Sequence, residues 1–250
     1  MERAVTRGGR LIAPDRPGLG RSEPETGRSL ASWAGDVAEL MNGLGLARFR
    51  VLAVSGGGPY ALALAWALPD RVERVALLSS PGSFDIPGAM DGMARAHRLM
   101  WLLARWQPRL LGWMLSRQLA ALADDAERFA QAIVGSMHGA DREALEALDE
   151  AGLRRFVTAP LIEALSQGTA GAVEDMRVLR APWGFGVQDI GVPVHLWHGE
   201  EDDATPRQMG GWLGAMIPRV DAHFLAGEGH TSTILRHADE AFEVLLAEAR

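Results

Sequence analysis

Cysteine and lysine are both absent from the 250 residues of the chain. The lack of cysteine excludes disulfides, thiolate metal sites and a cysteine nucleophile, and nothing opposes a reducing compartment. All 25 basic residues are arginine, which indicates a GC-rich coding sequence rather than a mechanism. Residues 1–10 contain no signal-peptide apolar segment, and the longest apolar run, Ala61 to Leu68, is too short to span a bilayer. We therefore expect a soluble, cytoplasmic protein.

An excess of positive charge is also missing, because the formal net charge is −7. Nucleic acid or an anionic membrane as a partner would require a basic face. We therefore expect neither partner. Hydrophobic residues make up 48% of the chain, which is enough to bury a large core in one domain or in a core with an insertion.

A serine stands at a sharp corner between an expected strand, Phe49 to Val54, and an apolar helix, Gly57 to Leu68. A strand-to-helix turn that pushes Ser55 out of the sheet needs small residues on both sides, and Ala53 and Gly57 provide them. The stretch therefore predicts a nucleophile elbow.

Two other interpretations of this corner remain open at this point. Serine before a helix is a common N-cap and needs no catalysis to explain it. The pattern Gly56-x-Gly58-x-x-Ala61 also satisfies a dinucleotide-binding fingerprint. The next strand, Val72 to Ser80, carries its acid, Glu73, at the start and not at the tip, which disfavours the dinucleotide interpretation.

Strands and helices alternate on both sides of a long helical stretch, which is typical of an α/β protein with a parallel sheet. We expect residues 1–82 and 184–250 to form the core and residues 83–183 an inserted all-helical cap. The expected core elements after a short apolar run at Arg10 to Ala13 are a helix from Ser29 to Leu44, the two strands and the helix named above, a strand from Val192 to His198, a helix from Pro206 to Met216, a strand from Val220 to Leu225, and a helix from Ser232 to Ala249.

The expected cap contains helices but no convincing strand. Its first helices carry a stripe rich in tryptophan and leucine, which we interpret as core rather than as a ligand-binding box. The stripe consists of Trp101, Leu102, Leu103, Trp106, Leu110, Leu111 and Trp113, with interruptions expected at Pro108 and Gly112. Further helices are expected from Asp124 to Met137, Asp141 to Phe156 and Pro160 to Leu179.

An acid and a histidine follow the elbow serine at later strand ends. A serine hydroxyl needs a base to take its proton, and that base needs a carboxylate to orient it. The loop Gly199 to Pro206 holds four acids, and the loop from Gly227 ends at His230. The order serine, acid, histidine accompanies a strand–turn–helix nucleophile, and all three lie at carboxyl ends of expected strands, where parallel sheets form their sites.

With these motifs the chain resembles the α/β-hydrolase fold family with a helical cap. The likeness extends over essentially the whole chain. Five segments carry it: Asp15-Arg16-Pro17-Gly18-Leu19-Gly20-Arg21-Ser22, Ser55-Gly56-Gly57-Gly58-Pro59, Pro69-Asp70-Arg71-Val72, His198-Gly199-Glu200-Glu201-Asp202 with Pro206, and Gly227-Glu228-Gly229-His230.

The resemblance implies roles for four residues. Ser55 is the nucleophile, His230 the general base and then acid, and Asp202 the orienting carboxylate, while Gly56 offers its backbone N–H to the oxyanion. Glu201 and Asp203 compete for the acid role. The resemblance implies no cofactor, a small-molecule substrate and no metal, and it leaves a homodimer open.

A pair of histidines in the fourth motif's strand, His195 and His198, has neighbouring acids and needs its own interpretation. Residues three apart on a strand point to opposite faces, so we expect no metal site there.

The chain departs from the family's pattern in two places. Ala53 replaces the first glycine of the elbow, which the turn accepts because alanine is small. The first three strands of the family, and the turn that donates the second oxyanion N–H, have no counterpart. We expect an upstream segment or, less favoured, direct pairing of two strands, Arg10–Ala13 and Phe49–Val54. A chain that starts at Met1 is expected to be poorly stable or weakly active.

The function that these features predict is hydrolysis of a small, largely apolar ester, lactone or amide through an acyl-enzyme on Ser55. The cap is expected to set substrate choice by roofing Ser55 with tryptophan and methionine side chains. Carbon–carbon bond hydrolases, acyltransferases and haloperoxidases of the family share the triad. A catalytically impaired or non-catalytic binding protein on the same fold is the alternative.

Overall fold

The computed structural model describes residues 9–247 of the chain, which divide into two compact units. The sheet unit comprises residues 9–13, 28–93 and 182–247, and the helical unit comprises residues 14–27 and 94–181. Residues 14–27 thus pack with the helices of residues 94–181, although residues 28–93 of the sheet unit lie between the two segments in the sequence. The expected domain boundaries, 82/83 and 183/184, stay a prediction.

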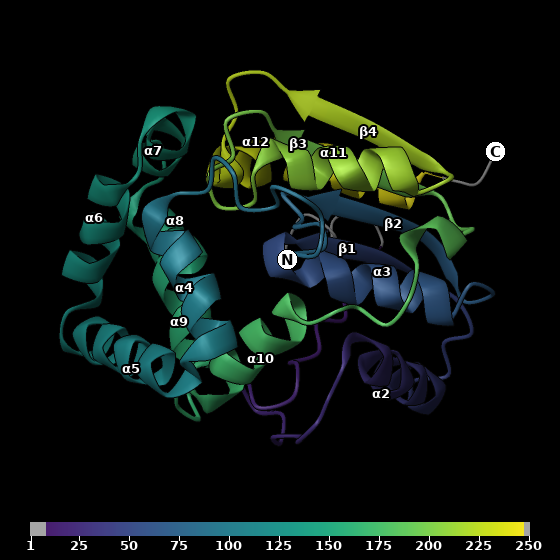
Figure 1. The fold of residues 1–250 in the computed structure, drawn as a ribbon, viewed down its shortest axis with the longest axis horizontal. Coiled ribbons are helices and arrows are strands. Elements are labelled where there is room, and N and C mark those ends of the chain that lie inside the picture. Colours follow the sequence, from purple (N-terminus) through teal and green to yellow (C-terminus); the bar gives the residue numbers. More distant parts are fainter. Residues whose placement is uncertain (1–8, 248–250) are drawn as a thin grey trace. The chain divides into compact units, whose positions relative to one another are not determined.

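The sheet unit is built on four parallel strands in the order β1-β2-β3-β4 (Figure 1). Val54 is level with Leu78, Leu78 with Trp197, and Trp197 with His223. The carboxyl ends of the strands therefore lie at one edge of the sheet, and the expected α/β class with a parallel sheet is confirmed. The strands are β1 (Phe49–Val54), β2 (Val72–Leu78), β3 (Val194–Gly199) and β4 (Val220–Leu225).

The strand expected at Arg10–Ala13 is wrong, because these residues have no regular structure. Leu11 is 41% exposed, so this apolar run is not buried in the core. The loop that begins at Pro14 follows it directly. Within residues 9–247, β1 pairs with β2 alone, so direct pairing of the two segments is also wrong.

Helices cover both faces of the sheet. α3 (Gly58–Ala67) and α11 (Arg207–Met216) lie on one face, and α12 (His230–Leu246) lies on the other (Figure 1). Strand alternation explains the division: Trp197 of β3 packs against α12, whereas the next residue, His198, faces α11. The position of a residue in the alternation along its strand therefore decides which face of the sheet, and so which helix, its side chain meets.

The helix before the first strand packs on α3 and begins where the sequence places it. This helix, α2 (Leu30–Gly43), is capped by Ser29, whose Oγ accepts the Ser32 N–H at 3.0 Å. Ser32 Oγ accepts the Ser29 N–H at 2.9 Å in return, which forms a reciprocal capping box.

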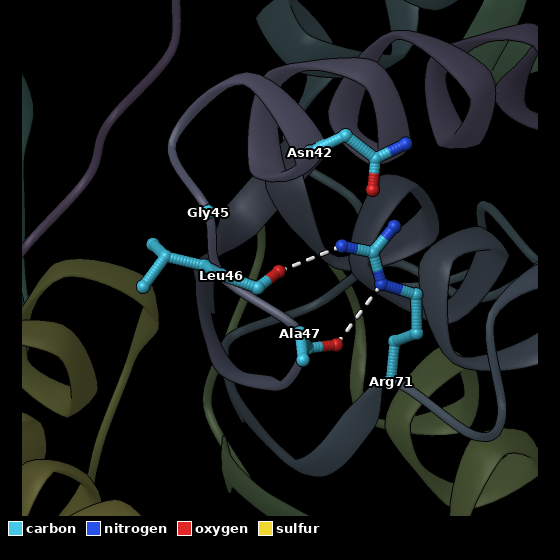
Figure 2. A pocket seen from close by; sticks show the side chains of 5 residues that line it. All are labelled: Asn42, Gly45, Leu46, Ala47 and Arg71. Carbon is cyan, nitrogen blue, oxygen red and sulfur yellow. Dashed lines mark hydrogen bonds between the residues drawn. The ribbon is translucent and has the colours of Figure 1, made fainter.

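The chain leaves α2 through a turn that an arginine holds in place. Figure 2 shows the guanidinium of Arg71 donating to the carbonyl oxygens of Leu46, at 2.7 Å, and Ala47, at 3.0 Å. A third bond reaches the Ala38 carbonyl at 3.3 Å. The bonds lie beside a surface hollow lined by Asn42 and Gly45. Arg71 of the Pro-Asp-Arg-Val motif therefore fixes the turn after α2 to the start of β2.

Two arginines on the sheet hold the carboxyl end of α12. Arg50 of β1 donates to the Leu245 carbonyl at 2.5 Å and also contacts Glu73 at 2.9 Å. Arg74 of β2 donates to the Val244 carbonyl. Cations at a helix carboxyl terminus satisfy its free carbonyls and complement its dipole. The helix whose first residue is His230 is thus fixed at its far end to the strands that flank the elbow.

The helical unit divides into more helices than the sequence pattern indicates. The expected helix Asp141–Phe156 is broken between Glu146, where α7 ends, and Glu150, where α8 begins. A π-helical turn, Arg154–Thr158, then lies between α8 and α9. The expected helix Pro160–Leu179 is split as well, whereas Gly112 interrupts nothing. The helices are α4 (Arg95–Trp106), α5 (Pro108–Asp124), α6 (Ala126–Ser136), α7 (Gly139–Glu146), α8 (Glu150–Leu153), α9 (Ala159–Ala164) and α10 (Ala170–Arg180).

The interpretation of the tryptophan-rich stripe as core is wrong for four of its seven residues. Leu103 and Leu111 are buried and pack toward α10, but Trp106 is 67% and Trp113 62% exposed. Leu102 and Leu110 are exposed with them. α4 and α5 each carry apolar residues on two faces, and only one face of each helix meets the core of the unit.

The loop of residues 14–27 is held to the helices of its unit by a bidentate ion pair and a close backbone approach. Arg16 donates from Nε and Nη2 to the two oxygens of Asp175 on α10, at 3.0 and 2.8 Å. Gly18 lies against Gly171, where a Cβ would come within 1.9 Å of the Gly18 oxygen. The aspartate, arginine and glycines of this motif therefore shape and anchor a loop.

Candidate active site

Ser55 occupies a strained turn between β1 and α3. Its φ is +49°, which is the left-handed region that a non-glycine residue adopts rarely. A Cβ placed on Gly57 would lie 3.6 Å from the Ala53 Cβ, which is ordinary contact. The two residues face each other across the turn, and the alanine at residue 53 fits there without conflict.

The glycine after Gly57 is required by packing. A Cβ on Gly58 would lie 1.8 Å from Ser80 Oγ and 2.6 Å from Ser80 Cβ. Because Ser80 is fully buried at the end of β2, the first turn of α3 can approach the sheet only without a side chain at residue 58. This contact holds the elbow against the neighbouring strand.

The structure brings Ser55, His230 and Asp202 together. His230 Nδ1 lies 2.8 Å from Asp202 Oδ2, and His230 Nε2 lies 3.0 Å from Ser55 Oγ. In the neutral tautomer that fits both distances, Nδ1–H donates to the carboxylate and Nε2 accepts the serine hydroxyl. All three residues belong to the sheet unit. His230 opens α12, so the expected helix start at Ser232 is two residues late.

The Asp202 carboxylate is fully buried and surrounded by donors. Its Oδ1 accepts the backbone N–H groups of Ala204 at 2.9 Å and Thr205 at 2.7 Å. Burial by itself raises the pKa of Asp202, but the charge of His230 and its hydrogen bond, together with His198 and the Thr205 N–H, hold the pKa below its usual value. The carboxylate is therefore ionised at neutral pH and can orient His230.

Thr205 and Ser79, neither of which the sequence predicted, also hold these residues in place. Thr205 Oγ1 lies 2.8 Å from Asp202 Oδ2, 3.1 Å from the Ser79 carbonyl oxygen and 3.3 Å from His230 Nδ1. Ser79, with a φ of +50°, donates its hydroxyl to the His230 carbonyl oxygen at 2.9 Å. A hydroxyl side chain three residues after Asp202 and directly before Pro206 could have indicated the role of Thr205. No such sequence feature points to Ser79.

A second histidine lies behind the acid. His198 is fully buried, its Nε2 lies 2.7 Å from the Thr205 carbonyl oxygen and 4.0 Å from Asp202 Oδ2. Burial lowers the pKa of His198. The neutral ring therefore donates from Nε2–H to Thr205, and it lies so close to Gly210 that a Cβ there would come within 2.5 Å of it.

The competing acids do not occupy the position beside His230. Glu201 is exposed and Asp203 is half-buried, while the contact to His230 Nδ1 comes from Asp202. Asp202 is thus the carboxylate that the geometry favours.

The two strand histidines have separate surroundings. His195 lies 3.5 Å from Asp221 and stacks on Trp197, whereas His198 faces α11. Within residues 9–247, no group of three or more histidine, aspartate or glutamate side chains has a metal-binding arrangement.

The remaining predicted site residue, Gly56, follows Ser55 in a short 3-10 turn, Ser55–Gly57, that leads into α3. Backbone N–H groups at a helix start point out of the helix and favour negative charge. Its position next to the serine is that of an oxyanion donor, and this role stays a prediction.

Comparison with known proteins gives family and fold. A model of the alpha/beta hydrolase fold family matches residues 2–236. The chain is 27% identical to pimeloyl-[acyl-carrier protein] methyl ester esterase of Nitrosomonas europaea, over 88% of this chain and 78% of that protein. It is 28% identical to 2-hydroxymuconate semialdehyde hydrolase of Pseudomonas sp. (strain CF600), over 96% and 77%. Bromoperoxidase from Bacillus anthracis superposes with a TM-score of 0.68 at 18% identity, over 98% of this chain and 83% of that one.

Coverage is lower for other curated relatives, because two shorter matches span only 27% and 37% of the proteins concerned. None of the helices within residues 9–247 has the length and apolarity needed to cross a membrane. Relatives that include a semialdehyde hydrolase and a methyl ester esterase support an enzyme of the hydrolase kind. On the family match over residues 2–236, the chain belongs to the alpha/beta hydrolase fold family.

Proposed function

We propose that the protein is a serine hydrolase that cleaves a small, largely apolar carboxylic ester through an acyl-enzyme on Ser55. One observation carries the proposal: His230 bridges Ser55 and Asp202 with hydrogen-bond distances of 3.0 and 2.8 Å. Nucleophile, base and orienting acid in such contact form the arrangement that activates a serine hydroxyl.

In the first half-reaction, Ser55 Oγ attacks the ester carbonyl carbon while His230 Nε2 takes the hydroxyl proton. The imidazolium is stabilised by the buried Asp202 carboxylate, which remains ionised. When the tetrahedral intermediate collapses, the carbon–oxygen bond to the alcohol breaks and His230 Nε2–H gives its proton to the leaving oxygen. The products of this half-reaction are the free alcohol and the Ser55 ester.

In the second half-reaction, water replaces the alcohol. His230 Nε2 takes a proton from water as its oxygen attacks the acyl carbon, and the same proton then returns to Ser55 Oγ. The acid is released and the serine and neutral histidine are restored. In this proposal the Gly56 N–H stabilises the oxyanion in both half-reactions, a contribution of about 3 kcal/mol for a well-aimed donor.

The substrate class rests on the relatives and on the nucleophile. One relative is named a methyl ester esterase, which favours esters. A serine at the elbow rather than a carboxylate disfavours epoxide and haloalkane hydrolysis. A second candidate is hydrolysis of 2-hydroxymuconate semialdehyde, because relatives with that name match this chain, one of them over 96% of its length.

Labelling with a fluorophosphonate tests the nucleophile directly. The protein is treated with the probe and the adduct is mapped by mass spectrometry. We expect one adduct on Ser55, no adduct in Ser55→Ala and strongly slowed labelling in His230→Ala. Ser116→Ala is the matched control, because Ser116 is exposed on α5 and its hydroxyl bonds with the Gly112 carbonyl and Thr169.

The same preparations are then assayed with p-nitrophenyl acetate, p-nitrophenyl butyrate and 2-hydroxymuconate semialdehyde. Turnover of the esters that is lost in Ser55→Ala supports the proposal, and turnover of the semialdehyde alone supports the second candidate. A folded protein that neither labels nor turns over any of the three would be a non-catalytic member of the fold.

A further inference from the structure

The outer surface of α4 and α5 combines exposed apolar side chains with unbroken positive charge. The five apolar residues are between 36% and 67% exposed: Leu99, Leu102, Trp106, Leu110 and Trp113. Five exposed arginines accompany them: Arg95, Arg98, Arg105, Arg109 and Arg117. We name these ten residues the α4–α5 outer face. Two tryptophans with more than half of their surface in water are costly unless something covers them.

The spacing of these residues shows that each helix presents a stripe. Leu99, Leu102 and Trp106 follow one another at intervals of three and four on α4, and Leu110 and Trp113 do so on α5. Gln107 alone joins the two helices, and Figure 1 shows them meeting at a corner in the helical unit. The buried residues of the opposite faces, Leu103 and Leu111, pack with α10. The α4–α5 outer face is therefore a different side of these helices from the side that packs in the core of the helical unit.

The charge of this segment differs in sign from that of the chain. Residues 92–123 contain five arginines and no aspartate or glutamate, in a chain with a net charge of −7. The first acids beyond the segment are Asp91 and Asp124. The expectation of no membrane partner followed from the net charge, and the local charge points the other way.

We infer that the α4–α5 outer face binds the surface of an anionic lipid bilayer, with the two helices lying along the interface. Leucine and tryptophan side chains enter the boundary between headgroups and acyl chains, while the arginine stems lie along the helices and their guanidinium groups reach the lipid phosphates. Tryptophan suits this boundary because its ring is apolar and its N–H is polar. Arg105 lies over the Trp106 ring, 4.9 Å from its centroid, so charge and aromatic surface arrive together.

Charge complementarity selects this occupant over a second copy of the chain. A two-fold dimer would place the same surface against itself and bring arginines against arginines with no acid between them. Nucleic acid would pair the arginines but leave three exposed leucines in water. An anionic bilayer satisfies both the cations and the apolar residues.

Vesicle flotation tests the inference with the full chain. Vesicles of equal parts phosphatidylglycerol and phosphatidylcholine are compared with vesicles of phosphatidylcholine alone, at low salt and at 0.5 M NaCl. We expect binding to the anionic vesicles that weakens at high salt, and at least tenfold weaker binding to the neutral vesicles.

Substitutions locate the binding surface. Arg105→Gln with Arg109→Gln should weaken binding about 25-fold, at about fivefold for each arginine near an anionic surface. Trp106→Ser with Trp113→Ser should weaken it at least tenfold. Two controls should bind as the parent does: Met216→Ser, at an apolar residue 40% exposed on α11, and Arg142→Gln, at an exposed arginine on α7.

Three results would overturn the inference. The first is no flotation with anionic vesicles, and the second is an equal loss of binding in the control variants. The third is dimerisation in analytical ultracentrifugation, or binding of single-stranded DNA, that the tryptophan pair abolishes without any vesicle binding. Circular dichroism and hydrolysis of p-nitrophenyl acetate without vesicles establish that each variant is folded.

Discussion

α3 and the pair α4 and α5 are both rich in apolar residues, yet they use them differently. Eight of the ten residues of α3 are buried, from Gly58 to Ala65, whereas α4 buries only Leu103 and Ala104 of its twelve. α3 is enclosed by the sheet and by α2, and it directly follows the turn that holds the elbow serine. Apolar composition alone therefore does not distinguish a helix that holds a site from a helix that presents a surface.

The largest contrast between the two regions should appear in catalysis. His230→Ala removes the base that contacts Ser55, and kcat/KM for p-nitrophenyl butyrate should fall about 10⁴-fold, while the urea midpoint changes little. Trp106→Ser with Trp113→Ser should change kcat/KM less than twofold. A loss of similar size in both variants would mean that the surface of α4 and α5 takes part in turnover.

Stability should separate the regions next. Leu62 of α3 is fully buried and Leu99 of α4 is 47% exposed. Leu62→Ala should lower the free energy of unfolding by about 3 kcal/mol, because it leaves a cavity, whereas Leu99→Ala should change it by less than about 0.5 kcal/mol. Urea denaturation of both variants measures the difference. Equal losses would show that the α4 residue is buried in solution.

The contrast also explains what the sequence could predict. The proximity of Ser55, Asp202 and His230 was predictable, because glycines mark the turns around them and all three follow strands of one parallel sheet. The burial of α3 was predictable too, because its apolar residues surround the whole helix and leave no face for water.

Other features had no local signal. When a helix carries apolar residues on two faces, its sequence does not indicate which face meets the core. The exposure of Trp106 and Trp113 could be seen only in the structure, where the opposite faces of α4 and α5 pack against α10. A serine at a strand end has many uses, so the bond from Ser79 to the His230 carbonyl was invisible. Arg10–Ala13 was expected as a strand from the family's pattern, although no strand lies beside it in the described part of the chain.

The close approach of α3 to β2 can be broken and restored. Gly58→Ala places a Cβ against buried Ser80, and we expect it to cost about 2 kcal/mol of stability and to slow labelling of Ser55. Adding Ser80→Gly removes the atoms in conflict and should recover at least half of the loss. No recovery in the double variant would argue that residue 58 is constrained by its backbone and not by Ser80.

A smaller effect should distinguish positioning from chemistry within the sheet unit. Thr205→Val removes the hydroxyl that contacts Asp202 and His230, and kcat should fall about tenfold with KM unchanged, since a hydrogen bond to a charged group contributes about 1.5 kcal/mol or more. Thr205→Ser keeps the hydroxyl and should restore most of the rate. If the serine variant is as slow as the valine variant, the methyl group and not the hydroxyl carries the role.

The smallest effect is a pH dependence of stability that arises in the buried region. His198 is buried as the neutral form, and burial lowers its pKa in the folded state, while the unfolded chain keeps a pKa of about 6.5. Between these two values the unfolded state binds more protons, so the stability that neutral His198 contributes is complete above about pH 6.5 and is lost as pH falls through the folded pKa. The urea midpoint should therefore drop between pH 7.5 and pH 5.5. In His198→Gln, which can still donate to the Thr205 carbonyl, the drop should be smaller even though the variant is less stable at both pH values.

His195, whose pKa is also lowered by burial, should contribute in the same direction, so His195→Gln should reduce the slope as well. Identical slopes in the parent and both variants would mean that neither ring titrates differently on folding.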